Sequence, residues 1–146
     1  MKNIIKFIFA FTIISFLFIS CKDNGTNNSN LSVNGNWEGS ITRFDSSSYS
    51  FTIIDLSLYL QQNQENVLGY GPFSKTDSSE NITMHDSYTV DASGSFANSV
   101  LNLKLTGLSG MSYVGLVSSN YNLIIGELII LSNGINDTIP LNLKRK

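Results

Sequence analysis

In residues 54–60 (IDLSLYL), aliphatic side chains stand at every second position, alternating with Asp55, Ser57 and Tyr59. Successive side chains of a β-strand point to opposite faces, so this pattern is typical of a strand with one buried side. The same alternation recurs in residues 101–105 (LNLKL) and 139–143 (IPLNL). The sequence therefore predicts half-buried β-strands.

Clusters of turn-forming residues separate these segments, and no apolar helical stripe of ten residues occurs after the N-terminal region. The clusters lie at residues 45–48, 62–66, 75–80, 91–94, 107–110, 118–120 and 132–137. They leave about eight short strands with no room for crossover connections, which favours an antiparallel meander.

Glycines inside the strand candidates indicate curvature. They are Gly39, Gly69, Gly71, Gly115 and Gly126. Glycine weakens a strand unless it marks a bend or bulge, so its repetition favours a strongly coiled sheet that closes on itself. The expected fold is all-β, a small antiparallel up-and-down barrel of about eight strands, and the alternative is a β-sandwich.

Composition narrows the function. The chain has 146 residues, 42% hydrophobic and 14% charged, with one His, one Cys and a formal net charge of -2. These values exclude a disulfide framework, a multi-ligand zinc site and a strongly basic surface for nucleic acid. We expect no cofactor, no metal and no nucleic-acid partner.

The N-terminus has the features of an export signal. Lys2 and Lys6 precede an apolar run over residues 7–19, and the small residue Ser20 stands before Cys21. The run is short for a membrane span. Residues 1–20 are therefore expected to be a cleaved signal peptide.

Residues 17–21 (LFISC) resemble the lipobox of bacterial lipoproteins, which implies that Cys21 is lipidated and becomes the first mature residue. Two acyl chains hold a protein stably to a bilayer. By the same resemblance, Lys22 rather than Asp after the Cys implies sorting to the outer membrane of the bacterial cell envelope. The alternatives are an uncleaved anchor and an exported protein with a free thiol.

Residues 21–34 are expected to be the lipidated Cys and a flexible polar tether, and residues 35–146 the barrel domain. Residues 22–34 are rich in Asn and Gly, with only Leu31 and Val33 as apolar groups. The mature chain has seven basic and eleven acidic residues, so its formal charge is -4. No polybasic patch remains to bind anionic lipid, so the membrane contact is expected to be the anchor itself.

A second resemblance rests on the ends of the domain. Gly35-Asn36-Trp37 opens the first strand, and Arg145 shares a face with Leu141 and Leu143 by parity. This is similar to the lipocalin and calycin signature, in which the first-strand Trp lies at the closed end of the barrel under a basic side chain. The resemblance implies that Gly35, Trp37 and Arg145 form a barrel-closing structural set.

Candidate catalytic groups are few, and we expect no enzyme. His85 alternates with Met84 on a face directed to solvent, and neighbouring Asp86 points the other way, so no triad forms. Glu38 and Glu127 are the only glutamates inside strand candidates. Glu38 is expected to face outward because it alternates with Trp37.

The side chains expected to face inward are numerous enough to fill an eight-stranded barrel. They are Trp37, Ile41, Leu56, Leu58, Leu60, Val67, Phe73, Ile82, Met84, Tyr88, Val90, Leu101, Leu103, Leu105, Met111, Tyr113, Val117, Ile125, Ile129, Ile139, Leu141 and Leu143. Residues 123–131 (LIIGELIIL) are apolar on both faces, so an oligomer contact, a partner or nearby loops are expected to cover the outer one.

Two functions follow from this architecture. The first is a lipid-anchored, lipocalin-like protein that binds a small apolar or amphipathic ligand in the barrel mouth, with Tyr70, Tyr88 and Tyr113 as candidate ligand or rim contacts. The second is an interaction lipoprotein with a filled barrel that recognises a protein or glycan partner. An internal cavity of about 300 Å³ or more favours the first, and a packed interior the second.

Overall fold

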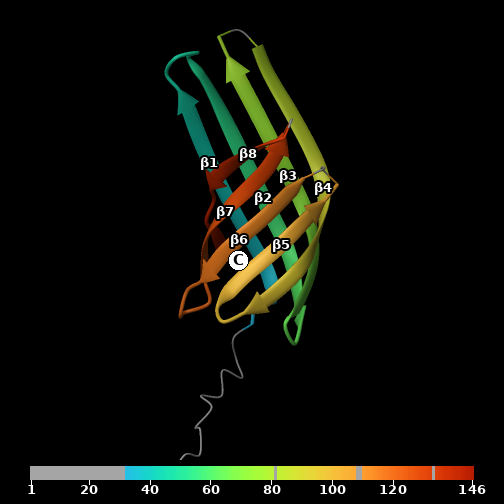
Figure 1. The fold of residues 1–146 in the computed structure, drawn as a ribbon. Helices are drawn as coiled ribbons and strands as arrows, with labels where there is room; N and C mark the ends of the chain where they lie inside the picture. Colours follow the sequence, from blue (N-terminus) through green and yellow to red (C-terminus); the bar gives the residue numbers. More distant parts are fainter. Residues whose placement is uncertain (1–31, 81, 108–109, 133) are drawn as a thin grey trace, which may run out of the picture. The chain divides into compact units, whose positions relative to one another are not determined.

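The alternating segments form one continuous antiparallel sheet (Figure 1). The structure is a computed structural model that describes residues 32–80, 82–107, 110–132 and 134–146. These residues contain nine strands: β1 (Gly35–Asp45), β2 (Ser50–Asn63), β3 (Asn66–Ser79), β4 (Ile82–Ala97), β5 (Val100–Thr106), β6 (Met111–Val117), β7 (Leu123–Ser132), β8 (Ile135–Pro140) and β9 (Leu143–Arg145).

The sheet closes on itself through its last strand. Strands β1 to β7 pair in chain order, and β9 pairs with both β7 and β1. The register along β7 continues unchanged from β8 into β9, so these two strands together form the eighth wall segment. The described chain is a closed antiparallel eight-stranded barrel with one extra strand, which confirms the expected lipocalin-like architecture. The β-sandwich alternative is wrong because the first and last strands are hydrogen-bonded to each other.

Apolar side chains fill the barrel. The buried set includes four large rings, Trp37, Phe73, Phe96 and Tyr113, together with aliphatic residues from every strand except β1. Most of the side chains expected to face inward do so. Interdigitated packing of this kind leaves few voids larger than a water molecule, so the interior serves as a core.

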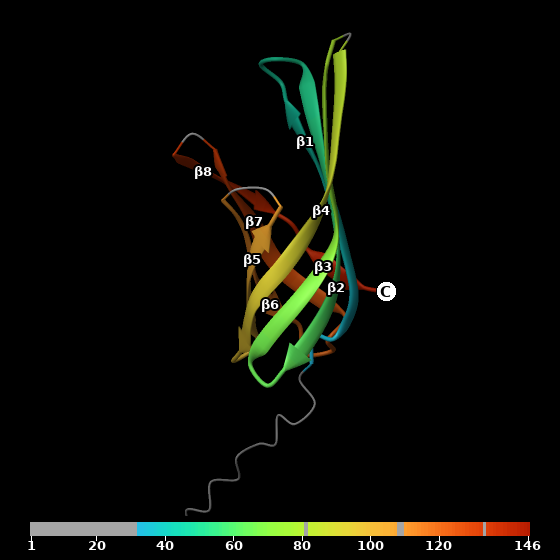
Figure 2. The same ribbon diagram turned by 90° about the vertical axis from the view of Figure 1, so that its right-hand side faces the viewer.

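Three residues of β4 that were expected to face inward do not reach the core. Ile82, Met84 and Tyr88 are exposed, whereas Val90 is fully buried. The physical reason is strand length: β4 pairs with β5 only from Asp91 onward. The β1–β2 and β3–β4 hairpins therefore run past the end of the barrel (Figure 2).

The inward face of β7 is the opposite of the one expected. Ile124 and Leu128 are buried, whereas Ile125 is 57% exposed and Ile129 only partly buried. Both faces of β7 are apolar, so hydrophobicity does not show which one is inward. The close approach of Gly126 to Tyr113 does. A Cβ at inward-facing Gly126 would lie 2.5 Å from the Tyr113 hydroxyl, so only glycine leaves room for that ring.

The domain begins earlier than residue 35. Val33 is fully buried, and its amide donates to the Gln62 side-chain oxygen at 3.0 Å. The Asn34 side chain accepts a hydrogen bond from the backbone amide of Gln62. Residues expected to belong to the tether therefore contribute to the core and to a cap over the end of β2.

A protein lacking residues 1–34 should be less stable than one lacking residues 1–30. The shorter chain loses the buried Val33 side chain, worth about 1.5–3 kcal/mol, and leaves the Trp37 indole N–H without its acceptor, at about 1–3 kcal/mol. Urea unfolding followed by circular dichroism measures the difference. Equal midpoints for the two proteins would show that Val33 adds nothing to the core.

Candidate functional site

Trp37 occupies one end of the barrel. The indole is fully buried, and its Nε1 donates to the Val33 carbonyl at 2.7 Å. Gly35 opens β1 two residues earlier. A buried indole usually finds a partner for its N–H, and here the entering chain supplies it.

Arg145 lies over this indole. The two residues are directly opposite in the β1–β9 register, and the Arg145 Cζ is 4.8 Å from the Trp37 ring centroid. One guanidinium nitrogen, Nη2, donates to the Ser32 carbonyl at 2.6 Å, whereas Nε is buried with no partner among the described residues. Cation–π attraction therefore stabilises the part of the guanidinium that lacks a hydrogen bond. The structure brings Trp37 and Arg145 together at this end of the barrel, whereas Gly35 is opposite Leu60 in the β1–β2 register.

The other end of β1 leads to an open mouth. A hollow of about 640 Å³ lies there. It is bounded by the end of β1, the start of β2, the second half of β3 and the β7–β8 hairpin. Ile54 and Ile139, both buried, and the partly buried Ile130 give it an apolar floor. Its remaining lining is mainly charged or hydroxylic, namely Arg43, Asp45, Ser46, Ser50, Thr52, Lys75 and Asp137, with Phe44.

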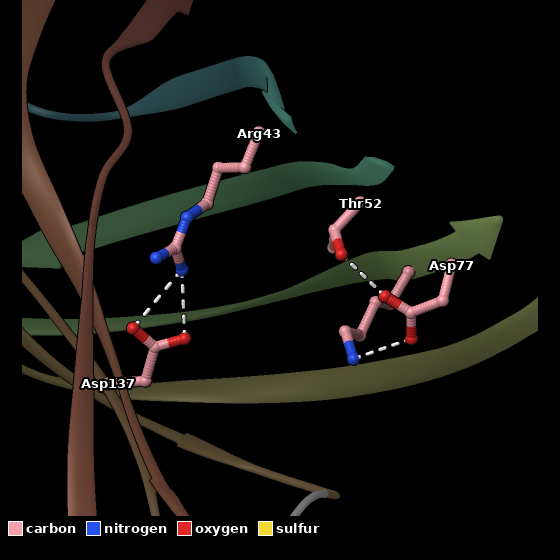
Figure 3. Close-up of polar contacts among 5 residues, drawn as sticks. Arg43, Thr52, Asp77 and Asp137 are labelled. Carbon is pink, nitrogen blue, oxygen red and sulfur yellow. Dashed lines mark hydrogen bonds and ion pairs between the residues drawn. The ribbon is translucent and has the colours of Figure 1, made fainter. Parts of the chain in front are cut away.

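An ion pair crosses the wall of this mouth. Nη1 of Arg43 in β1 contacts both carboxylate oxygens of Asp137 in β8, at 3.1 and 2.9 Å (Figure 3). Strand β1 pairs with β9 only at Trp37 and Glu38, so no backbone ladder joins β1 to β8 at this level. Both side chains are about half exposed, so the pair is easily opened.

A second polar cluster lines the adjoining wall. Asp77 accepts hydrogen bonds from Thr52 at 2.6 Å and from Lys75 at 2.6 Å (Figure 3). Partial burial acts to raise the pKa of Asp77, but the bonds from Lys75 and Thr52 outweigh it and hold the pKa below its usual value. At the hairpin tip, hydrogen bonds from Ser47 and then Ser48 lower the pKa of Asp45 to about 2. Both carboxylates are therefore ionised near neutral pH.

The three candidate tyrosines lie in three different places. Tyr113 is in the core, not at a rim: its hydroxyl donates to the Leu141 carbonyl at 3.0 Å, and burial raises the pKa of the phenol well above 10. Tyr88 is 40% exposed and directly opposite the buried Phe73, where β4 leaves the barrel. Tyr70 is on the outer face of β3. None of the three lines the hollow at the mouth that is described above.

The other candidate groups are dispersed. His85 is exposed as expected, and its Nδ1 is 2.8 Å from the Thr76 hydroxyl. Glu38 forms an ion pair with Lys146, and Glu127 is exposed on β7. Cys21 lies outside the described residues. Within the described ranges, no cluster of three or more His, Cys, Asp or Glu side chains is arranged to hold a metal.

Comparisons with protein-family models, curated proteins and solved structures give no match to this chain. Among the described residues, no helix has the length and hydrophobicity that a membrane-spanning segment needs. The candidate site therefore rests on its own geometry.

The charged lining of the mouth was not predicted from the sequence. The sequence nevertheless contained a sign of it. Lys75 and Asp77 stand at alternate positions after the inward-facing Phe73, and Arg43 stands two residues after Ile41, so all three are on the inward face of their strands. A charged side chain on the inward face shows that a strand has left the core, since buried charges are rare.

The contact between Trp37 and Arg145 should appear as coupling in a double-mutant cycle. Arg145→Ala should cost about 0.5–2 kcal/mol in the wild-type background, and less beside Trp37→Phe because the smaller ring gives weaker stacking. Urea unfolding of the four proteins measures both values. Costs that add within about 0.5 kcal/mol would mean that the two residues do not interact in solution.

Proposed function

We propose that the mature protein is a lipid-anchored, lipocalin-like envelope protein that binds a small amphipathic ligand at the open mouth of its barrel. The observation that carries this proposal is the mixed lining of the mouth, which has an isoleucine floor beneath charged walls. Sites for small molecules commonly combine apolar surface with a few placed polar groups, in volumes of about 300–1,000 Å³.

The packed interior counts against a ligand cup inside the barrel and favours a filled barrel, so the ligand is proposed to sit above the core, at the mouth. Because Trp37, Tyr113 and Phe73 occupy the barrel, an apolar chain cannot pass deeply into it. The apolar part of the ligand rests on Ile54, Ile130 and Ile139, and its polar part meets the groups of Arg43 and Asp137. The proposal assigns no catalytic step to the protein.

The anchor follows from the lipobox-like segment at residues 17–21. Lipidation of Cys21 supplies two acyl chains, which suffice for stable membrane association. Lys22, rather than Asp, after the Cys favours delivery to the outer membrane, as the resemblance to bacterial lipoproteins implies.

Acidifying the floor of the mouth should weaken ligand binding. Ile130→Glu places a carboxylate against the bound apolar chain, whose desolvation is costly, so binding should fall at least about tenfold. The matched control is Leu131→Glu, the next residue along β7, which is exposed on the outer face. Fluorescence titration with a dansyl-labelled fatty acid measures both proteins. No binding to the wild type, or equal weakening by both changes, would contradict the mouth site.

Cys21→Ser tests the anchor separately. The variant should appear in the soluble fraction or remain as an uncleaved precursor, because serine offers no thiol for lipidation. Fractionation and mass spectrometry of the wild type and the variant provide the measurement. A cleaved variant that still requires detergent for extraction would exclude a lipid on Cys21.

A protein partner is the second candidate function, and it has its own observation. Leu116 of β6 and Ile125 of β7 are directly opposite each other on the outer face and are 58% and 57% exposed. Val114 extends this apolar surface along β6, whereas on β7 the exposed Glu127 lies between Ile125 and the exposed Leu131. Adjoining exposed aliphatic side chains are typical of protein contacts.

A further inference from the structure

Two tyrosines form an aromatic pair on the outer face of the barrel, away from the mouth. Tyr59 of β2 and Tyr70 of β3 are directly opposite each other, with ring centroids 5.8 Å apart and planes tilted by 59°. They are 37% and 58% exposed, and the Tyr59 neighbours Leu58 and Leu60 are buried on the other face. The barrel core therefore fixes the backbone of an exposed aromatic platform.

Shallow hollows flank this pair on both sides. One, of about 950 Å³, extends from Tyr59 along Leu68 toward the β2–β3 turn. The other, of about 490 Å³, lies beside Tyr70 and Pro72 and reaches Lys146. Tyr59 lines both hollows and Tyr70 lines the smaller one, so the two hollows adjoin at the Tyr59 ring, and we call them together the groove.

The polar groups of the larger hollow are neutral. Its lining has no charged side chain and includes five amides, those of Asn34, Gln61, Gln62, Asn63 and Asn66. The Asn34 and Gln62 side chains are held by hydrogen bonds to backbone groups. By contrast, the amides of Asn63 and Asn66 have no partner among the described residues and are free to bind a ligand.

We propose that this groove binds a neutral oligosaccharide. The face of an aromatic ring carries partial negative charge and attracts the polarised C–H groups on the flat side of a sugar ring. Amides both donate and accept hydrogen bonds, which matches the paired donor and acceptor character of sugar hydroxyls. Tyrosine supplies rigid contact area at low entropic cost, and asparagine supplies adaptable hydrogen bonds.

Other ligand classes fit the groove less well. Nucleic acid requires several cations, but the charged groups of the smaller hollow are Glu38 and Lys146, which form an ion pair at 2.5 Å. An extended peptide cannot add a strand here, because β2 and β3 are paired on both sides at Tyr59 and Tyr70.

Affinity electrophoresis through gels that contain dextran, mannan or glycogen tests the proposal, with alginate as the acidic comparison. At least one neutral polysaccharide should retard the wild-type protein, and Tyr70→Ala should raise the apparent dissociation constant at least fivefold. Tyr70→Phe should retain binding because the ring remains. Tyr49→Ala, which removes an exposed tyrosine at the β1–β2 turn, should have no effect.

Asn66→Ala provides a second probe, because it removes an amide of the groove without touching the aromatic pair, and it should weaken binding at least twofold. Circular dichroism melts establish that each variant is folded. Lack of retardation by all three neutral polysaccharides overturns the proposal, as does retardation by alginate alone or equal loss in Tyr49→Ala and Tyr70→Ala. Ile130→Glu should leave glycan binding unchanged, so the mouth and the groove can fail independently.

Discussion

Closure of the sheet by three residues, Leu143–Arg145, is the constraint on which the other features depend. This short strand pairs with β7 on one side and β1 on the other, and a closed sheet has no edge to protect at that level. The contact area is small, so side chains must reinforce it. Arg145 does so by joining the Trp37 ring to the Ser32 carbonyl, which also holds the entering chain against the core.

Differences in strand length convert this closed barrel into one with a mouth. Because β1 to β4 continue past the point where β5 ends, the inward faces of β1 and β3 change there from aliphatic to charged, and that of β2 changes to hydroxylic. The ion pair between Arg43 and Asp137 then joins β1 to β8, which no backbone ladder joins at this level. An exposed ion pair contributes about 0–1 kcal/mol, so this wall of the mouth can adjust to a ligand while the packed core stays rigid.

Alternation at 54–60, 101–105 and 139–143 predicted the strands and their buried faces, because a period of two specifies both. Closure into a barrel rather than a sandwich was favoured by the glycines inside the strands. The ends at Trp37 and Arg145 were also accessible from the sequence. Three features were not. Ile82 and Met84 are in solvent because β4 extends beyond its pairing with β5. Both faces of β7 are apolar, so alternation did not identify the buried one. Val33 belongs to the core through tertiary contacts, which include the hydrogen bonds to Gln62 and Trp37.

The two proposed sites share strands but have little physical reason to interfere. The outer groove lies over a backbone that core side chains from Leu58 and Leu60 hold in place, whereas the mouth lies farther along the same strands, where Thr52 and Arg43 have left the core. Interior packing transmits little motion between them unless it has two alternative arrangements. The chain enters at the Trp37 end, and β1 places its far end about 35 Å away at about 3.4 Å per residue. A lipid on Cys21 would therefore join the domain at its closed end and leave the mouth at the end farthest from the point of attachment.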